Sequence, residues 1–173
     1  MDAAFHEHFM RLALAEAEKA ARLGEVPTGC VIVQKPADPE TPPHAARVIG
    51  CGHNQTETQK NPTAHAEMLA IQQASANLGG WRLDNTVLYV TKEPCAMCAG
   101  AVVLARVPLV VCGFTDPKRG GISLFNITGH PNLNHHPEIL VDVLRDECLA
   151  HFQNFFQSCR NPEERPAKPV GNH

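Results

Sequence analysis

The sequence has no apolar stretch approaching the roughly 18 residues that indicate a membrane helix. Its most apolar region, residues 87–114, is interrupted by three charged side chains. The N-terminus lacks a basic segment followed by an apolar one, so it does not resemble a secretory signal peptide. Glutamates among its first 18 residues argue against an organellar transit peptide. We therefore expect a cytoplasmic protein by default.

An excess of positive charge is also absent. The formal net charge of the chain is −3, whereas nucleic-acid-binding domains are often strongly basic. Overall charge therefore gives no support for nucleic-acid binding, although a local basic patch remains compatible with it. Any nucleic-acid substrate must be inferred from the residues of a specific site.

A disulfide framework is not expected either. The chain has seven cysteines, an odd number, and no secretory signal was identified above. Only Cys95 and Cys98 form a close pair, and the other five fall within apolar or helical stretches. Such cysteines often behave as small buried hydrophobic residues. The close pair is therefore the cysteine pattern that calls for a chemical explanation.

The length of 173 residues and the absence of internal repeats predict one domain over residues 1–160. Three prolines in the tail at 161–173 predict a disordered segment. A long loop with four prolines, residues 36–46, separates the first two predicted strands. Apolar spacing and helix-stop signals predict helices over 3–23, 61–78, 95–106 and 144–159. Strands are predicted over 29–35, 47–52, 86–90, 109–114 and 138–141.

The order of these elements predicts the fold class. A strand, a helix and a strand follow one another after residue 86, which favours a parallel unit. In the helix over 61–78, one face is marked by Met68, Ile71, Ser75 and Leu78. The helix over 95–106 is apolar nearly all round, so we expect it to be buried. The whole predicts an α/β protein, a three-layer α/β/α sandwich with a mixed five-stranded sheet.

Cys95 and Cys98 follow Pro94 at the predicted start of a helix. Residues three apart lie on the same face of a helix, so the two thiolates can share one metal ion. The positive end of the helix dipole and the free N–H groups favour the ionised thiols. Two sulfurs leave a zinc ion short of its full ligand set. His65 opens the other internal helix and becomes a third ligand if the two helix N-termini point to one place.

Three protein ligands and a water molecule are typical of a catalytic zinc site, whereas structural sites usually close with four. No second Cys-x-x-Cys and no His-x-x-x-His motif supplies an obvious fourth ligand. Glu67 lies two residues after His65, in the first helical turn, where both side chains can reach a site beyond the helix end. A carboxylate there can act as general acid and base.

Each motif has a simpler explanation by itself. A lone Cys-x-x-Cys in a helix is often a packing feature or a redox pair, and a lone His-x-Glu carries little information. Here both motifs open a predicted helix, and Pro94 precedes the cysteines. Together they predict a zinc site.

The segments His65-Ala66-Glu67 and Pro94-Cys95-Ala96-Met97-Cys98 match the signature of zinc nucleobase deaminases. The sequence resembles the bacterial tRNA-specific adenosine deaminases of the TadA type over most of its length. The resemblance includes Glu25-Val26-Pro27, Gly52-His53-Asn54, Asn132-Leu133-Asn134-His135 and Phe155-Phe156. Cytidine deaminases share the zinc signature, but we would not expect these later stretches in them.

The resemblance implies a cytidine deaminase-like fold, one zinc ion per subunit and Glu67 as the catalytic residue. It implies the wobble adenosine of a tRNA anticodon as substrate and inosine as product. It also implies a homodimer with active sites near the subunit interface. Asn54 is implied to hydrogen-bond the flipped base or its sugar, and further substrate or RNA contacts are implied at Val26, Pro27, Asp116, Asn134, His135 and Phe156. By themselves, these residues have simpler explanations as turn or core residues.

The chain departs from the family pattern at the rim of the expected pocket. The loop at 36–46 is longer than usual, Thr28 and Lys92 stand where aliphatic residues are common, and residues 118–121 differ. Because of these changes, the range of substrates stays open. They do not affect the predicted zinc chemistry. Candidates to neutralise RNA phosphates are Lys118, Arg119, Arg106 and Arg160, with an ordinary solvated surface as the alternative.

Other functions stay open on the sequence. A deaminase of a free nucleobase or nucleoside, such as guanine or cytidine, would use the same zinc site without RNA contacts. A non-catalytic zinc-binding subunit is a second alternative, against which the presence of Glu67 argues. Cytidine deamination on a nucleic acid is a third. Single-stranded anticodon bases can be splayed outward at low cost, so the tRNA substrate suits the chemistry.

Overall fold

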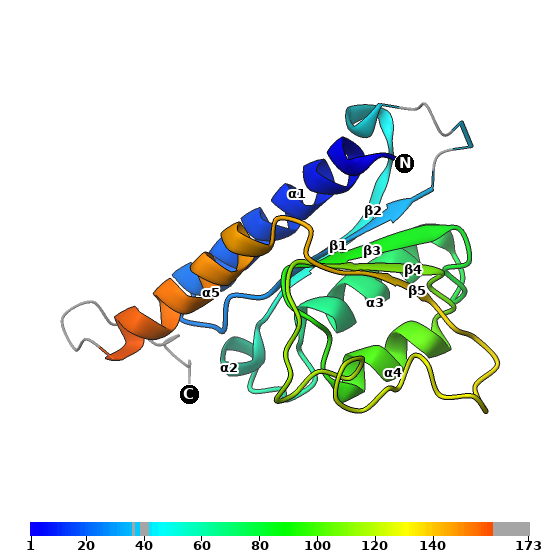
Figure 1. Cartoon of the computed structure of the whole chain (residues 1–173). Helices are drawn as coiled ribbons and strands as arrows, with labels where there is room; N and C mark the ends of the chain where they lie inside the picture. Colours follow the sequence, from blue (N-terminus) through cyan, green and yellow to red (C-terminus); the bar gives the residue numbers. More distant parts are fainter. Residues whose placement is uncertain (36, 39–41, 161–173) are drawn as a thin grey trace.

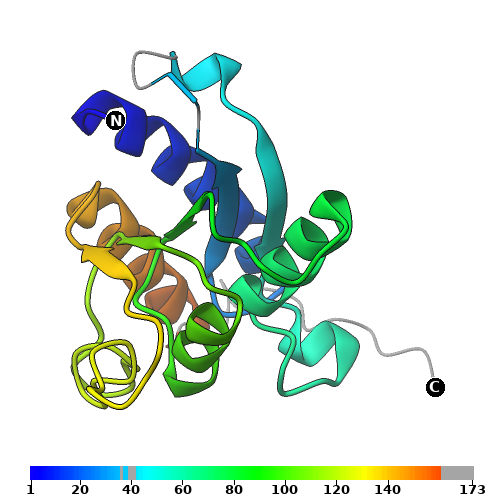
Figure 2. The ribbon, with the colours of Figure 1, turned by 90° about the vertical axis from the view of Figure 1, so that its right-hand side faces the viewer.

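In a computed structural model, the chain forms one five-stranded sheet with helices on both faces (Figures 1 and 2). The structure describes residues 1–35, 37–38 and 42–160. The tail at 161–173, for which disorder was predicted, lies outside the described residues, as do positions 36 and 39–41 of the proline-rich loop. None of the described helices is both long enough and apolar enough to cross a membrane.

The order of helices and strands follows the prediction closely. The helices are α1 (Ala3–Arg22), α2 (Thr56–Gln59), α3 (Ala66–Leu78), α4 (Ala96–Leu104) and α5 (Arg145–Arg160). The strands are β1 (Gly29–Gln34), β2 (Val48–His53), β3 (Thr86–Val90), β4 (Leu109–Cys112) and β5 (Glu138–Leu140). Sequence patterns did not indicate α2 or the short 3₁₀ helix at Pro43–Ala45.

The sheet is mixed, with the strand order β2-β1-β3-β4-β5. β1 pairs in antiparallel fashion with both β2 and β3, whereas β3–β4 and β4–β5 are parallel pairs. α1 and α5 lie side by side on one face, and α3 and α4 cover the other (Figures 1 and 2). This arrangement confirms the predicted three-layer α/β/α sandwich.

Both faces of the sheet are buried, so its central strands are nearly continuous apolar runs. Side chains that alternate along β1 and β3 enter two separate cores. Val31 and Tyr89 pack under α1, whereas Ile32 and Leu88 pack under α3 and α4. The sheet is thereby held rigidly between two helical layers, and the ends of its strands can position a site.

The structure corrects the predicted start of the helix over 61–78. Asn61 closes a turn before this helix, because its side-chain oxygen accepts the N–H of Thr63 at 2.9 Å. The helix itself begins only at Ala66, with His65 as its N-cap residue. The Asn-Pro-Thr segment therefore shapes the approach to α3 and is not part of it.

The buried face of α3 also differs from the face that its longer side chains marked. A row of alanines, Ala66, Ala70 and Ala74, is buried, because β2 carries glycines beneath it. A Cβ at Gly50 would lie 2.4 Å from the carbonyl oxygen of Ala70, and one at Gly52 would lie 2.5 Å from that of Ala66. Helix and strand backbones thus approach closely, and this contact fixes the N-terminus of α3.

α4 is shorter than predicted and is buried on one side only. The side chains of Cys98, Ala99, Val102 and Val103 are buried, but Leu104 is 74% exposed. The expectation that this helix is buried all round is therefore wrong for the single chain. An apolar outer face of α4 remains uncovered.

Replacing Gly50 by alanine tests the close approach between β2 and α3. We expect Gly50→Ala to lower the free energy of unfolding by about 1–3 kcal/mol, because backbone atoms oppose the added methyl group. Urea denaturation followed by circular dichroism measures this change. Gly80→Ala is the matched control, since nothing lies within 4 Å of a Cβ at Gly80. Equal stability of the two variants would contradict the close contact.

Candidate metal centre and active site

The N-termini of α3 and α4 carry the residues of the predicted catalytic centre. His65 and Cys95 are the N-cap residues of these helices, and Glu67 and Cys98 lie in the first turns. Neither cap side chain is hydrogen-bonded to its own helix backbone, so both are available beyond the helix ends. The positive ends of the helix dipoles favour anionic groups at this place.

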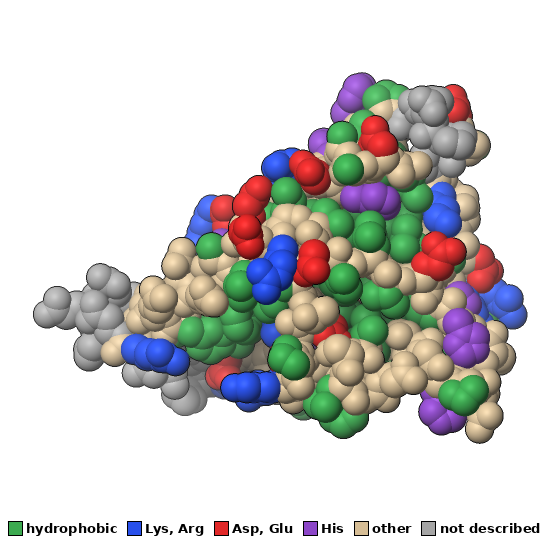
Figure 3. All heavy atoms as spheres, viewed as in Figure 1, with side chains coloured by type: hydrophobic (Ala, Val, Ile, Leu, Met, Phe, Trp, Pro, Cys, Tyr) green, Lys and Arg blue, Asp and Glu red, His purple; other side chains and the backbone are tan. Residues whose placement is uncertain are grey.

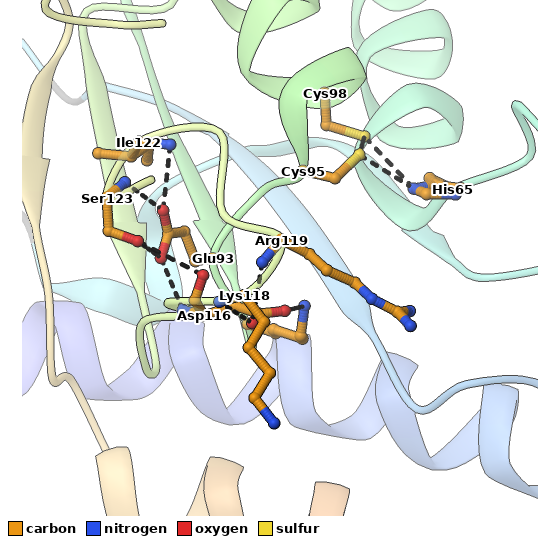
Figure 4. A network of polar contacts seen from close by, with 10 residues as sticks. His65, Glu93, Cys95, Cys98, Asp116, Lys118, Arg119, Ile122 and Ser123 are labelled. Atoms are coloured by element: carbon orange, nitrogen blue, oxygen red, sulfur yellow. Dashed lines mark hydrogen bonds and ion pairs between the residues drawn. The ribbon is translucent and has the colours of Figure 1, made fainter. Parts of the chain in front are cut away.

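The three predicted metal ligands converge. The sulfurs of Cys95 and Cys98 lie 3.7 Å apart, and each lies 3.6 Å from Nδ1 of His65 (Figure 4). A tetrahedral zinc ion with Zn–S bonds of about 2.3 Å and a Zn–N bond of about 2.0 Å needs ligand separations of about 3.8 and 3.5 Å. The residues therefore fit one face of a tetrahedral site. Within the described part of the chain, these three residues form the cluster of potential metal ligands whose ligand atoms lie close enough together to hold one ion.

Hydrogen bonds couple the protons of this triad. The bond with the Cys98 thiol, together with His65, lowers the pKa of Cys95 to about 3. The same bond, together with burial, raises the pKa of the Cys98 thiol, and the bond to Cys95 raises the pKa of His65. Thiols bind a metal ion as thiolates, so metal binding through both sulfurs releases any proton that the pair still carries.

Glu67 is a buried carboxyl group with an unused oxygen. Its exposed fraction is 3%, and its Oε2 atom has no hydrogen-bond partner among the residues that the structure describes. Burial raises the pKa of this carboxyl group. An unpartnered polar atom in the interior costs folding free energy. Its presence therefore indicates a functional role for Glu67 and not a contribution to stability. Beside the triad, such a group can accept a proton and return it.

Asn54 lies beside the N-terminus of α3 and is 8% exposed. Its Oδ1 accepts the N–H of Ala66 at 2.9 Å, and its backbone N–H donates to the carbonyl oxygen of Thr28 at 3.1 Å. The first bond fixes the orientation of the side-chain amide. Val26, which is 38% exposed, and the buried Pro27 directly precede Thr28. The structure therefore brings Asn54, Val26 and Pro27 to the same region as the triad.

Asp116 lies on a loop packed against the segment that leads from β3 into Cys95. Its carboxylate pairs with the ammonium group of Lys92. It also accepts the backbone N–H groups of Lys118 and Arg119 at 3.0 and 3.2 Å. Sequence analysis singled out Lys92 as a departure from the family pattern but did not predict this pairing. Within the chain, the Asp116 carboxylate thus serves to shape its own loop.

Phe156 lies near the C-terminal end of α5 and is 37% exposed. Its ring centroid is 4.9 Å from that of Phe152, and the ammonium nitrogen of Lys92 lies 5.8 Å from the Phe152 ring. Aromatic contacts thereby connect the end of α5 to the Lys92–Asp116 pair, so Phe156 and Asp116 belong to one neighbourhood.

Asn134 and His135 lie at the opposite end of α4 from the triad. Arg106 donates to Oδ1 of Asn134 at 2.6 Å, and Nε2 of His135 lies 2.7 Å from the carbonyl oxygen of Val107. These partners follow the C-terminus of α4, and a helix of nine residues is about 13 Å long. The structure does not bring Asn134 and His135 to the triad of the same chain. Arg106, a candidate phosphate contact, is engaged by Asn134.

Sequence analysis missed Glu93 as a site residue. Its carboxylate is 3% exposed and accepts the backbone N–H groups of Asp116, Ile122 and Ser123 at 2.6, 3.0 and 2.6 Å (Figure 4). An acidic residue next to an apolar strand and two positions before Cys95 was the available signal. Its partners lie 23 to 30 residues further along the chain, so no local spacing connects them.

The fold and the site together define a class of protein. A His-x-Glu pair at one helix start and a Pro-Cys-x-x-Cys pair at another are the features of nucleobase deaminases. The sequence matches the MafB19-like deaminase family over residues 4–148.

Two curated relatives are tRNA-specific adenosine deaminases. The chain is 43% identical over 164 residues to the one from Bacillus subtilis, with 94% of this chain and 95% of that protein covered. It is 42% identical over 167 residues to the one from Streptococcus pyogenes serotype M1, with 96% and 89% covered. Both relatives align along nearly their whole length.

A solved structure from studies of A-to-I editing by tRNA:A34 deaminases at the wobble position of transfer RNA has a similar fold. Its TM-score is 0.75 at 37% sequence identity, with 83% of this chain and 98% of that chain covered. The chain therefore belongs to the MafB19-like deaminase family and to the family of tRNA-specific adenosine deaminases. This confirms the resemblance drawn from the motifs.

The geometry of the triad predicts one divalent metal ion bound through two thiolates. We expect Cys98→Ala to lose most of the bound metal, because one of three protein ligands is removed. Inductively coupled plasma mass spectrometry of the purified protein measures the metal content. Cys159→Ala changes a half-buried cysteine outside the triad and should retain the metal. Equal metal content in the two variants would refute the ligand assignment.

Proposed function

We propose that this enzyme uses a zinc ion to convert the wobble adenosine of a tRNA anticodon to inosine, by hydrolytic removal of the C6 amino group. The observation that carries the proposal is the buried, unpartnered Glu67 carboxyl group beside an open His–Cys–Cys triad. The tRNA substrate is supported by relatives named tRNA-specific adenosine deaminase at 42% and 43% identity. The similar tRNA:A34 deaminase structure supports the wobble position.

Zinc is the proposed metal because two thiolates and an imidazole at tetrahedral separations suit that ion. His65, Cys95 and Cys98 would hold one ion per subunit and leave a fourth position available. When bound, zinc supplies the Lewis acidity that makes water a competent nucleophile near neutral pH.

Glu67 is proposed to move the protons of the reaction. Its carboxylate takes a proton from the water that attacks C6 of adenine. It then delivers one proton to N1 of the ring and one to the exocyclic nitrogen, so that the C–N bond breaks and ammonia leaves. Adenosine and water are consumed, and inosine and ammonia are formed. The burial of Glu67 limits proton exchange with bulk solvent during these transfers.

The substrate contacts are proposed around the triad end of α3. Asn54 has its side-chain oxygen occupied by the helix backbone, so its amide N–H groups are the part available to the base or ribose. Val26 and Pro27 would form one wall, with Asp116 and Phe156 at the rim. Anticodon bases are single-stranded, and turning one outward into such a site costs little.

RNA binding must rely on local cations, because the overall charge is negative. Basic, acidic and hydrophobic side chains are interspersed over the face seen in Figure 3, with no continuous basic surface there. Lys118 and Arg119 are exposed and lie next to Gly120, which pairs with Cys95 in an isolated β-bridge. They are the cations that we assign to RNA phosphates beside the site.

The alternatives raised by the sequence are weakened by these observations. A non-catalytic subunit would have no need of a buried, unpartnered Glu67. A deaminase of free guanine or cytidine would not be expected to share about two fifths of its residues with tRNA-specific relatives along nearly the whole chain.

All seven cysteines are unpaired, as in reducing compartments, which supports the cytoplasm as the place of action.

An anticodon stem-loop with adenosine at the wobble position tests the proposed reaction. We expect the zinc-loaded protein to form inosine, detected by mass spectrometry of nuclease digests. Glu67→Gln keeps the side-chain shape and should retain zinc, while its rate should fall by roughly 10²–10⁴ because the proton carrier is lost.

Free adenosine, guanine and cytidine serve as parallel substrates in this assay. Faster deamination of a free base or nucleoside than of the stem-loop would contradict the proposed substrate, as would the absence of inosine. Undiminished activity in Glu67→Gln would contradict the role of that residue without affecting the substrate assignment.

We propose further that two copies of the chain form a homodimer through the outer face of α4. Leu104 on this helix is 74% exposed, and the loop that packs on α4 exposes Leu124 and Phe125 to 50% and 57%. Exposed apolar side chains that form one contiguous patch are typical of protein interfaces, and we propose that these three residues contribute to such a patch. Asn134 and His135 lie on a loop that contacts the residues just after the C-terminus of α4. A partner bound to the outer face of α4 would lie next to this loop. We propose that Asn134 and His135 reach the active site of that partner.

Gly100→Arg tests the homodimer. Nothing lies within 4 Å of a Cβ at Gly100, so an arginine fits the single chain but places a charge on the outer face of α4. We expect sedimentation equilibrium to show a dimer for the wild type and a monomer for Gly100→Arg. Gly80→Arg, at a glycine that also faces open space, should remain dimeric. A monomeric wild type would reject this interface.

A further inference from the structure

The two cations assigned to RNA phosphates are carried by one loop, residues 116–123, which we call the cationic loop. Lys118 and Arg119 are exposed in this loop, and neither forms an ion pair with any of the residues that the structure describes. Long exposed side chains have many rotamers, and fixing them costs conformational entropy. The loop backbone therefore sets the region that the two charged groups can reach.

A single buried carboxylate holds the cationic loop together. Oε1 of Glu93 accepts the N–H groups of Ile122 and Ser123 at 3.0 and 2.6 Å. Oε2 accepts the N–H of Asp116 at 2.6 Å and the Ser123 hydroxyl at 2.8 Å. A carboxylate offers about four acceptor sites, so the whole hydrogen-bonding capacity of Glu93 is directed to this loop (Figure 4).

The loop also closes tightly over the carboxylate. A Cβ at Gly120 would lie 2.1 Å from Oε1 of Glu93, so only glycine fits at this position without a rearrangement. The Glu93 carboxylate therefore packs directly against the loop backbone at Gly120.

Glu93 belongs to the segment that supplies a metal ligand. It stands two residues before Cys95, and the loop is bound to the same segment by its backbone. Gly120 forms an isolated β-bridge with Cys95, and the N–H of Gly121 donates to the carbonyl oxygen of Pro94 at 2.8 Å. The positions of the Cys95 sulfur and of the cationic loop are thus set by one short stretch of chain.

Lys92 ties the loop to this stretch through a second contact. Its ammonium group pairs with Asp116, and the two side chains are 16% and 14% exposed. Asp116 in turn accepts the backbone N–H groups of Lys118 and Arg119. This fixes the backbone at these two residues but leaves the two cationic side chains free, and they extend away from Glu93 in Figure 4.

We propose that Glu93 is a positioning residue that holds Lys118 and Arg119 in register with the metal triad, so that they bind the phosphates flanking the target nucleotide. The inference rests on the proposed function, because it assigns RNA as the ligand of these cations. A carboxylate is needed because it accepts four hydrogen bonds and donates none. A glutamine would turn an NH₂ group toward N–H donors and leave part-buried donors of the loop unpaired, which is costly.

Direct binding of an anticodon stem-loop, measured by fluorescence anisotropy at several salt concentrations, tests the proposal separately from turnover. We expect Glu93→Gln to weaken binding about tenfold and to reduce the slope of log affinity against log salt by about 1.4, since each phosphate of a single strand contributes about 0.7. The double variant Lys118→Gln/Arg119→Gln should show the same change. Adding Glu93→Gln to that double variant should cost little more, because the displaced cations are already absent.

Two further variants separate positioning from general damage. Arg145→Gln removes an exposed cation that pairs with Asp142 at the start of α5, and its RNA affinity should match the wild type. Ser123→Ala keeps the carboxylate and removes one donor, and a loss of about two- to threefold is expected. Metal content should be unchanged in both and in Glu93→Gln. Amide hydrogen exchange at Ile122 and Ser123 should rise in Glu93→Gln.

Unchanged affinity and salt slope in a folded, metal-loaded Glu93→Gln protein would overturn the proposal, as would fully additive losses in the combined variant. If Glu93→Gln does not fold, Ser123→Ala decides: weaker binding supports the proposal and wild-type affinity overturns it. A wild type that binds the stem-loop but forms no inosine, with the same losses in Glu93→Gln, would overturn the proposed reaction alone. A wild type that does not bind the stem-loop would overturn both.

Discussion

The site depends on the meeting of two helix N-termini at one end of a rigid sheet. His65 and Cys95 are 30 residues apart in the chain, yet each is the N-cap residue of its helix. α4 follows β3 directly, whereas α3 is placed by the contact of its alanines with the glycines of β2. A small change in that contact would move His65 and Glu67 together, relative to both cysteines. The packing of the α3 backbone against β2 thus sets the dimensions of the triad.

Sequence analysis predicted those site residues that are related by short spacings along the chain. Cys95 and Cys98 belong to one helical turn, and Glu67 follows His65 by two residues, so spacing alone relates them. The strands were predictable for a similar reason, because burial on both faces makes them continuous apolar runs. The outcome for α3 shows where such rules stop. The glycines of β2 determine which face of α3 is buried. The sequence of the helix alone does not indicate this.

Longer-range relations escaped prediction for the same physical reason. Glu93 is explained by partners more than 20 residues away on the cationic loop. Asn134 and His135 came from a family resemblance, which names residues without locating them. In the single chain their contacts tie them to the far end of α4. The apolar exterior of α4 was misread as core because an apolar helix fits a domain interior and a subunit interface equally well.

The charges of the site explain why the cations must be placed and not merely present. Cys95, Cys98 and Glu67 bring up to three negative charges, and a divalent zinc ion would offset two of them. A phosphate chain entering this region therefore meets no attraction from the centre itself. Lys92 cannot supply it, because its charge is offset by Asp116. Lys118 and Arg119 remain, and the loop that carries them is held by hydrogen bonds to Glu93. Screening shortens the reach of exposed charges to about 8–10 Å at physiological salt, so attraction of RNA to the triad requires these two side chains within that distance of it.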